Sequence, residues 1–278
     1  MRKLKEYLKK PLSFVMLLLI IISTVITALT VVFIIGYILI KGVPNLSPQL
    51  FSLKYSSSNQ SMLPSIINTV YLTALTLILA VPIGIFSAIY LAEYSRKNSL
   101  FVKIINVANE TLSGIPSIVY GLFGFLAFVI SKKWGYSLLA GVITLAIMVL
   151  PLIIRTSQEA MLGVDNSFRE ASYGLGAGKL RTVFKIVLPS AMPGILSGII
   201  LAIGRIVGET AALIYTAGTV PEVATKLTSS SRTISVHLYC LLNEGLYTEQ
   251  AYATAVVLII FVVIINALSN ALAKKIMK

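Results

Sequence analysis

The sequence predicts an all-α integral membrane protein with six transmembrane helices. Of its 278 residues 57% are hydrophobic and only 12% are charged, and the apolar residues gather into long uncharged runs. A soluble domain carries roughly 25% charged residues, so this chain has too few polar side chains to cover a soluble surface. The basic residues stand at the edges of the apolar runs, as is typical of chains that cross a bilayer.

Each predicted span is long enough to cross a bilayer, which takes about 20 helical residues. The spans are residues 12–40, 63–92, 112–131, 136–154, 191–218 and 251–272. The first is about twice as long as the apolar core of a cleavable signal peptide, roughly 7–15 residues, and is therefore predicted to be a true span. The third contains Gly114 and Pro116, so we expect it inside the bundle, where neighbouring helices satisfy its loosened backbone.

The positions of Lys and Arg predict the orientation, because loops that stay in the cytoplasm are enriched in both. With the N-terminus inside, sixteen of the 23 basic residues fall in inside segments and six in outside segments. The remaining one, Arg205, lies within the fifth span. Both termini are therefore predicted to be cytoplasmic. The connecting segments have no apolar core of their own, so residues 1–278 are expected to form a single transmembrane domain.

Composition also excludes several classes of function. A net charge of +13 would suit nucleic acid only if basic and aromatic residues shared a soluble face, so no nucleic-acid partner is expected. Cys240 has no second cysteine to pair with, and no Cys/His cluster has metal-ligand spacing. We interpret His237 as an ordinary surface or packing residue rather than a proton relay, and Glu110 as part of the cytoplasmic face.

Residues 156–190, between the fourth and fifth spans, read as a polar helix, a glycine break and a basic amphipathic helix. Ser167 and Glu170 have capping-box spacing, and Gly176 is expected to help end the first helix. Pro189 is predicted to stop the second helix before the next span. The apolar face of that helix would contain Leu180, Val183, Phe184 and Val187. Periodicity alone leaves open whether the segment rests on lipid headgroups or docks a partner.

This segment resembles the EAA signature of ABC-importer permeases, which reads Glu-Ala-Ala, three residues, Gly, nine residues, Ile-x-Leu-Pro. The matching residues are Glu170, Ala171, Gly176, Ile186, Leu188 and Pro189. Ser172 stands where the third position is usually Ala. The resemblance implies a type I importer permease bundle in which residues 156–190 couple the spans to a cytoplasmic ATPase.

A second pattern in this segment is misleading. The letters GLGAGK at 174–179 are similar to a P-loop, but Tyr173 stands where that motif needs glycine and Leu180 where it needs a hydroxyl. The chain is therefore expected to bind no cofactor and to catalyse no reaction, with ATP and Mg²⁺ used by the partner ATPase.

Arg205 and Glu209 stand four residues apart in the fifth span and are predicted to share one face of one helix. Gly194, Gly198 and Ala202 fall on that face, and such small residues let another helix approach closely. A charge inside a span costs on the order of 2.5–3.5 kcal/mol and usually serves a function. Two interpretations stay open: a salt bridge that locks the helices, or an arginine on the route of an oxyanion.

Two patterns resemble the permease subunits of the bacterial phosphate-specific ABC importer. Arg205, Gly208, Glu209 and Thr210 match Arg-x-x-Gly-Glu-Thr, and residues 116–121 match Pro-Ser-Ile-Val-Tyr-Gly. The continuation ETAALIYTAG is more similar to the PstA subunit than to PstC, with Ala212 replacing a usual proline. We expect Arg205, Glu209 and Thr210 to line the translocation pathway. Ser113 and Ser117 would either line it too or satisfy helix backbone.

The resemblance implies a permease subunit of an ATP-driven phosphate importer in a prokaryotic cytoplasmic (inner) membrane. Its implied partners are a homologous PstC-like permease, two PstB-like ATPase subunits, an extracytoplasmic phosphate-binding protein and the lipid bilayer. The alternatives within the family are the PstC-type role and a sulfate or molybdate permease. A gradient-driven secondary transporter would not need the 170–189 segment, and an intramembrane enzyme would need a catalytic constellation.

Overall fold

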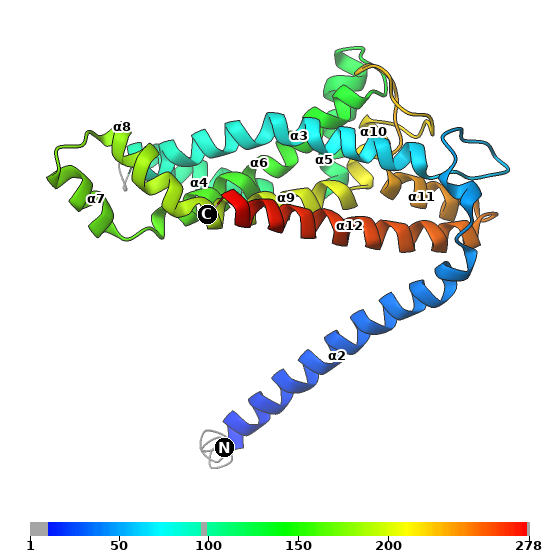
Figure 1. Cartoon of the computed structure of the whole chain (residues 1–278), viewed down its shortest axis with the longest axis horizontal. Helices are drawn as coiled ribbons and strands as arrows, with labels where there is room; N and C mark the ends of the chain where they lie inside the picture. Colours follow the sequence, from blue (N-terminus) through cyan, green and yellow to red (C-terminus); the bar gives the residue numbers. More distant parts are fainter. Residues whose placement is uncertain (1–10, 96–98, 277–278) are drawn as a thin grey trace.

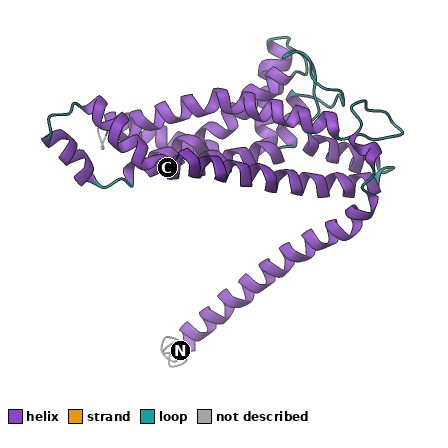
Figure 2. Ribbon diagram, viewed as in Figure 1, coloured by secondary structure: helices purple, strands orange, loops and turns teal. Residues whose placement is uncertain are grey.

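A computed structural model describes residues 11–95 and 99–276, and over this part the fold consists of helices and loops (Figures 1 and 2). Five helices are long and apolar enough to cross a membrane, and a bent pair raises the number to six. The five are α2 (Pro11–Gly42), α3 (Leu63–Ile89), α6 (Leu138–Leu162), α9 (Leu188–Gly208) and α12 (Thr248–Ile276). The predicted fold class is confirmed.

The long helices run back and forth between two ends of the molecule (Figure 1). One end, here the α7 end, holds α7 (Asn166–Gly174) and α8 (Lys179–Thr182). The other, the α11 end, holds α11 (Ile234–Glu244) and the connecting loops. Smaller elements are η1 (Val43–Asn45), η2 (Pro48–Phe51) and the π-helical turns η3 (Tyr90–Tyr94), η4 (Phe125–Ser131) and η5 (Val183–Val187).

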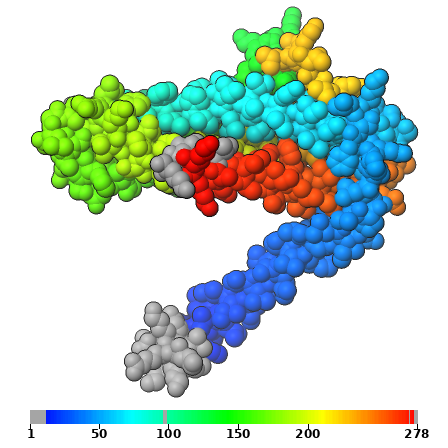
Figure 3. All heavy atoms as spheres, viewed as in Figure 1, coloured from blue at the N-terminus to red at the C-terminus, as the bar shows by residue number. Residues whose placement is uncertain are grey.

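Helix α2 leaves the bundle and stands apart from it (Figure 3). It is held near its C-terminal end, where the rings of Tyr37 and Tyr252 lie 5.9 Å apart and Gly42 packs against Val256 of α12. Most of its large apolar side chains are exposed. In water such a surface would be unfavourable, so α2 requires lipid or another hydrophobic helix around it.

The third predicted span, 112–131, is not one helix. It consists of α4 (Leu100–Ser113), α5 (Ser117–Gly124) and η4, and the chain bends by 100° between α4 and α5. Pro116 lacks an N–H and keeps the preceding residue out of the helical region, so α4 ends before it. Tyr120 donates its hydroxyl to the carbonyl oxygen of Leu112 at 2.9 Å, which satisfies one backbone acceptor freed by the break.

The fifth predicted span, 191–218, also has different bounds. The chain is continuously helical from Lys179 to Gly208, through α8, η5 and α9. It then breaks at Glu209, whose backbone is extended, and resumes as α10 (Ala211–Thr216). The prediction was wrong here because Glu209 leaves the helix to bond with Ala212 and Ser235, contacts that the helical spacing of Arg205 and Glu209 does not reveal.

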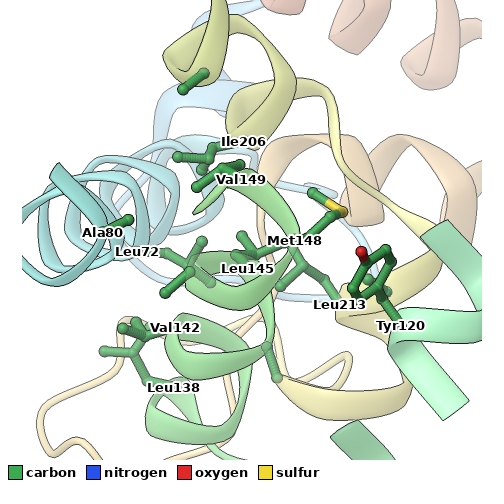
Figure 4. Close-up of a cluster of buried hydrophobic side chains, with 14 of the residues drawn as sticks. Leu72, Ala80, Tyr120, Leu138, Val142, Leu145, Met148, Val149, Ile206 and Leu213 are labelled. Carbon is green, nitrogen blue, oxygen red and sulfur yellow. The ribbon is translucent and has the colours of Figure 1, made fainter. Parts of the chain in front are cut away.

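The core of the bundle lies between α3, α5, α6, α9 and α10 (Figure 4). Leu72 and Leu145 meet Met148, Ile206 and Leu213 there, and each is at most 1% exposed. Lipid is as apolar as these side chains, so close van der Waals packing rather than exclusion from water holds such helices together. Small residues at the contacts are therefore as important as large ones.

Gly121 shows how tight these contacts are. A Cβ built on it would lie 2.8 Å from the Cα of Ala212 in α10, and the atoms it meets belong to the backbone. We therefore expect Gly121→Ala to destabilise the purified protein by about 1–3 kcal/mol, the usual cost of overpacking. Thermal or chemical unfolding in detergent measures this change.

Gly204→Ala in α9 is the matched control, because nothing lies within 4 Å of a Cβ at that position. Alanine there should leave stability unchanged or raise it, since helix propensity favours alanine over glycine by up to about 1 kcal/mol. Equal effects of the two substitutions would contradict the packing described for Gly121.

Candidate coupling segment and intramembrane site

Helix α7 begins with a cap that the sequence did not single out. Asp165 is its N-cap residue, and the Asp165 carboxylate accepts the backbone N–H of Ser167 at 2.8 Å. That bond lowers the pKa of Asp165 below its usual range. The predicted capping box of Ser167 and Glu170 is therefore wrong, because Ser167 already lies inside the helix. Glu170 is exposed and free of a capping role.

The glycine of the signature has a conformational reason. Gly176 has φ +81°, in the left-handed region that side chains rarely adopt. Its N–H donates to the carbonyl of Tyr173 at 2.9 Å, and the next N–H, of Ala177, donates to Ser172 at 3.1 Å. These bonds satisfy carbonyls at the end of α7 and turn the chain toward α8. The prediction that Gly176 helps end the helix is confirmed.

Pro189 does not stop the second helix as predicted. It lies in the first turn of α9, directly after the π-helical turn η5. A π turn already interrupts the regular i to i−4 bonding, so the missing proline N–H costs little at this point. The second helix of the coupling segment, as we call residues 156–190, is therefore continuous with the fifth span from Lys179 to Gly208.

Only half of the predicted apolar face of this helix is buried. Val183 and Val187 are fully buried in a small core with Met161 and Ile195 at the α7 end. Leu180 is 66% exposed and therefore lies on the surface. Phe184 is also on the exposed side.

The exposed side of the coupling segment carries a group of large apolar residues, which we call the apolar loop face. It contains Phe168, Tyr173, Leu175, Leu180 and Phe184. They belong to α7, α8, η5 and the loop between α7 and α8, and α7 and α8 form one end of the molecule (Figure 1). Leu175 at the tip is 90% exposed, and Glu170 lies on the surface of the same helix α7. An apolar patch at a loop tip, bordered by polar groups, is typical of a protein-binding surface.

A buried ion pair fixes α7 to the bundle. Arg169 of α7 contacts the carboxylate of Glu93 in η3 at 2.6 Å, and the two side chains are only 13% and 6% exposed. The same guanidinium donates to the carbonyls of Val164 at 2.7 Å and Met161 at 2.8 Å. One arginine therefore joins the ends of α3, α6 and α7.

The two halves of the coupling segment are joined as well. The hydroxyls of Ser172 and Thr182 share a buried hydrogen bond of 2.9 Å, which gives a physical role to the serine that departs from the signature. The ammonium of Lys179 lies 4.9 Å from the ring centre of Tyr94, also in η3. Turn η3 thus contacts both α7 and α8.

Arg205 and Glu209 do not form the shared helix face that their spacing predicted. Arg205 is half-buried in the last turn of α9, whereas Glu209 lies beyond the helix end. The Glu209 carboxylate, 8% exposed, accepts the N–H of Ala212 at 3.0 Å and caps α10. The described residues form two ion pairs, Arg155–Glu159 and Arg169–Glu93, so the salt-bridge interpretation is not supported.

The two phosphate-permease patterns come together in space although about ninety residues separate them. Helix α5, which carries the 116–121 pattern, packs on α10, which follows Glu209 and Thr210. Gly121 lies against Ala212, and Gly124 lies against Thr216. The structure thus places both helix breaks, at 114–116 and at Glu209, in one region of the bundle.

The two candidate serines differ. Ser113 is exposed and donates its hydroxyl to the carbonyl of Asn109 at 2.7 Å, in agreement with the backbone-satisfying interpretation. Ser117 is half-buried at the first position of α5, next to the break. Glu110 is exposed, as predicted, and lines a polar cavity of about 210 Å³ together with Asn106, Asn109, Arg155, Gln158, Glu159 and Leu162.

Sequence reasoning missed two residues at the α11 end. His237 is fully buried and Arg232 is 4% exposed, although both lie in a polar stretch of the sequence. A single histidine and a single arginine between apolar segments carry no periodic pattern, so the sequence offered no signal for their burial.

Comparison with known proteins identifies the family. The family described as "Binding-protein-dependent transport system inner membrane component" matches residues 80–278. The chain belongs to this family. The prediction of an ABC-importer permease is confirmed, and the secondary-transporter and intramembrane-enzyme alternatives are not favoured.

Named relatives cover nearly the whole permease. The probable ABC transporter permease protein YqgI of Bacillus subtilis is 32% identical over 261 residues, 87% of this chain and 88% of that protein. The phosphate transport system permease protein PstA of Haemophilus influenzae is 31% identical over 269 residues, 95% of each chain. Both relatives are named as permease proteins, in agreement with the permease role expected for this chain.

Solved structures share the fold of the permease. A bacterial ABC transporter that imports the acidic polysaccharide alginate aligns with a TM-score of 0.67 and 18% identity, covering 100% of both chains. The MetNI methionine ABC transporter aligns with a TM-score of 0.58 and 16% identity over 77% of this chain and 94% of that one. At such identities the likeness concerns the fold alone.

The buried ion pair leads to a prediction about stability. Arg169→Gln leaves the Glu93 carboxylate buried without its partner, so we expect a loss of about 3–5 kcal/mol. The double variant Glu93→Gln/Arg169→Gln removes both charges and should recover a large part of that loss. Unfolding of the purified wild type, Arg169→Gln, Glu93→Gln and the double variant gives the complete double-mutant cycle.

Arg155→Gln is the control, because the Arg155–Glu159 pair is 55% and 63% exposed. Exposed pairs contribute little, so this variant should unfold like the wild type. If the two single arginine variants were equally stable, the Arg169 pair would not fix α7 as described.

Proposed function

We propose that the permease is one half of the translocation pathway of an ATP-driven inorganic phosphate importer, in the PstA role. The observation that carries this proposal is the meeting of two breaks: the 116–121 pattern packs against the helix that follows Arg205, Gly208, Glu209 and Thr210. Arg205 is the half-buried cation beside that junction. A guanidinium presents paired N–H donors that suit a tetrahedral oxyanion.

Glu209 has a different role in this proposal from the one its spacing suggested. Its carboxylate accepts a hydrogen bond from the first turn of α10, which stabilises the break between α9 and α10. It forms no ion pair with Arg205 among the described residues. The arginine therefore keeps its charge available for the anion, and its orientation depends on the end of α9. Thr210 and Ser117 lie at the two breaks and complete the proposed lining.

The partners follow from the two surfaces of the permease. The apolar loop face and Glu170 would dock a PstB-like ATPase in the cytoplasm, two copies of which use ATP and Mg²⁺. The exposed α2 would pack in lipid and against a homologous PstC-like permease. An extracytoplasmic phosphate-binding protein would deliver substrate at the α11 end, with both chain termini cytoplasmic in the inner membrane.

The test of this function is uptake of labelled phosphate by vesicles that contain the permease, its neighbouring permease, the ATPase and the binding protein. We expect uptake that requires ATP and is not reduced by excess sulfate or molybdate. Transport of sulfate or molybdate instead would keep the coupling segment and reject phosphate. Uptake without the ATPase would reject the whole assignment.

Glu170→Lys tests the docking role. Because Glu170 is exposed and makes no cap, reversing its charge should leave folding and membrane insertion intact while abolishing ATP-driven uptake. Co-purification with the ATPase and the uptake rate are measured together. Unchanged uptake would sink the assignment of this surface to the ATPase. Lys103→Glu, at an exposed position of α4 outside residues 156–190, should keep wild-type uptake and is the control for surface charge alone.

Arg205→Gln tests the pathway. The variant keeps a hydrogen-bonding side chain of similar length but loses the charge, so phosphate uptake should fall by at least tenfold, about 1.4 kcal/mol or more. The amount of bound ATPase should stay the same. Wild-type transport kinetics in this variant would remove Arg205 from the route of the anion.

A further inference from the structure

Two nitrogen-rich side chains are buried together at the α11 end. Arg232 is 4% exposed and His237 is not exposed at all. Within the described residues, the Nε and Nη2 atoms of Arg232 have no hydrogen-bond partner. The ring nitrogens of His237 make no hydrogen bond of normal geometry, although the nearby Gln60 backbone partly opposes the fall in the pKa of this ring. Burial and the neighbouring Arg232 lower the pKa of His237 to about 3, so His237 is neutral at physiological pH and Arg232 supplies the single charge.

The segment 52–61 covers these groups without neutralising them. The guanidinium carbon of Arg232 lies 4.8 Å from the ring centre of Tyr55, and the same ring meets His237 edge to face at 6.3 Å. The Tyr55 hydroxyl donates to the side-chain oxygen of Gln60 at 2.8 Å. Gln60 is 2% exposed with φ +45°, a backbone conformation that only surrounding contacts maintain.

Among the described residues, no carboxylate lies within ion-pair distance of the Arg232 guanidinium. It belongs to neither of the two ion pairs, Arg155–Glu159 and Arg169–Glu93. An aromatic face compensates a cation only in part. Arg232 also precedes the N-terminus of α11, where the helix dipole favours a negative charge and opposes a positive one. A buried charge without a partner is strongly unfavourable.

We propose that Arg232 and His237 form a binding site for one small inorganic anion beneath the segment 52–61. The Arg232 Nε and Nη2 groups and one N–H of His237 donate to the anion. The nitrogen atoms are closed off from solvent, so the anion enters when segment 52–61 shifts, and a large organic anion is excluded.

The proposed site is linked to the break beside Arg205. Thr233 and Ser235, between Arg232 and His237 in sequence, share a hydroxyl hydrogen bond of 3.1 Å. Ser235 also donates to the carbonyl oxygen of Glu209 at 2.6 Å. A bound anion therefore connects the covering segment 52–61, the start of α11 and the end of α9.

Thermal unfolding of the purified full-length permease in detergent tests the site. Potassium gluconate is replaced stepwise by potassium chloride or by potassium phosphate at constant ionic strength and pH. A ligand that binds the folded state raises the midpoint with the logarithm of its concentration above Kd. We expect a rise of a few degrees in chloride, in phosphate or in both, and none in gluconate. The more effective salt identifies the anion.

Variants separate this site from other cations. Arg232→Gln should lose the dependence on the anion, and Arg232→Lys should keep a weaker one. Lys226→Gln removes an exposed charge from the loop between α10 and α11, which also contains Arg232, and should behave like the wild type. The phosphate-transport proposal is judged by uptake and this one by the unfolding midpoint, so the two proposals can fail independently.

Two results would overturn the proposal. One is a wild-type midpoint that is the same in all three salts, which means that water alone satisfies the buried nitrogens. The other is an Arg232→Gln protein with wild-type dependence on the anion. If Arg232→Gln does not fold, the wild type and Arg232→Lys still decide the matter. Crystals grown in bromide then locate the ion by anomalous scattering, expected within hydrogen-bond distance of Arg232.

Discussion

The structure depends on one constraint: a backbone group that lies in lipid must find its hydrogen-bond partner within the protein. A helix break in a span is therefore possible only where other parts of the chain supply partners. At the first break Tyr120 donates to the carbonyl of Leu112, and at the second Glu209 accepts from Ala212 while Ser235 donates to Glu209. The helices that follow the two breaks, α5 and α10, pack against each other, whereas Gly114 and Pro116 at the first break are themselves exposed in this chain.

The coupling segment is attached to the bundle on one side and exposed on the other. Val183 and Val187 fill a small core at the α7 end, and Arg169 ties α7 to Glu93. These contacts hold the segment on the bundle while Leu175 at its tip stays 90% exposed. The π turns η3 and η5, both at this end, widen the helices locally. Such turns are common at functional sites.

The sequence predicted what depends on local pattern. The apolar runs locate the spans, and Gly176 marks a turn because only glycine adopts its positive φ without strain. It could not predict the break at Glu209, because that residue leaves the helix for bonds with groups in α10 and α11. Nor could it choose between Asp165 and Ser167 as the cap, since both residue types cap helices well. Burial of Arg232 and His237 depends on distant segments and has no local signature.

Helix α9 connects the coupling segment to the helix break at Glu209. It follows η5 without interruption and ends beside Arg205, so its 21 residues span about 31 Å at 1.5 Å per residue. Gly194 and Gly198 bring it close to Ala160 and Thr156 of α6, and close packing of this kind permits sliding or rotation only as a unit. Under the proposed function, α9 would carry a displacement of the coupling segment to its own end beside Arg205. Glu209 links the end of α9 to its neighbours: its carboxylate bonds to Ala212 in α10, and its carbonyl oxygen accepts from Ser235 in α11.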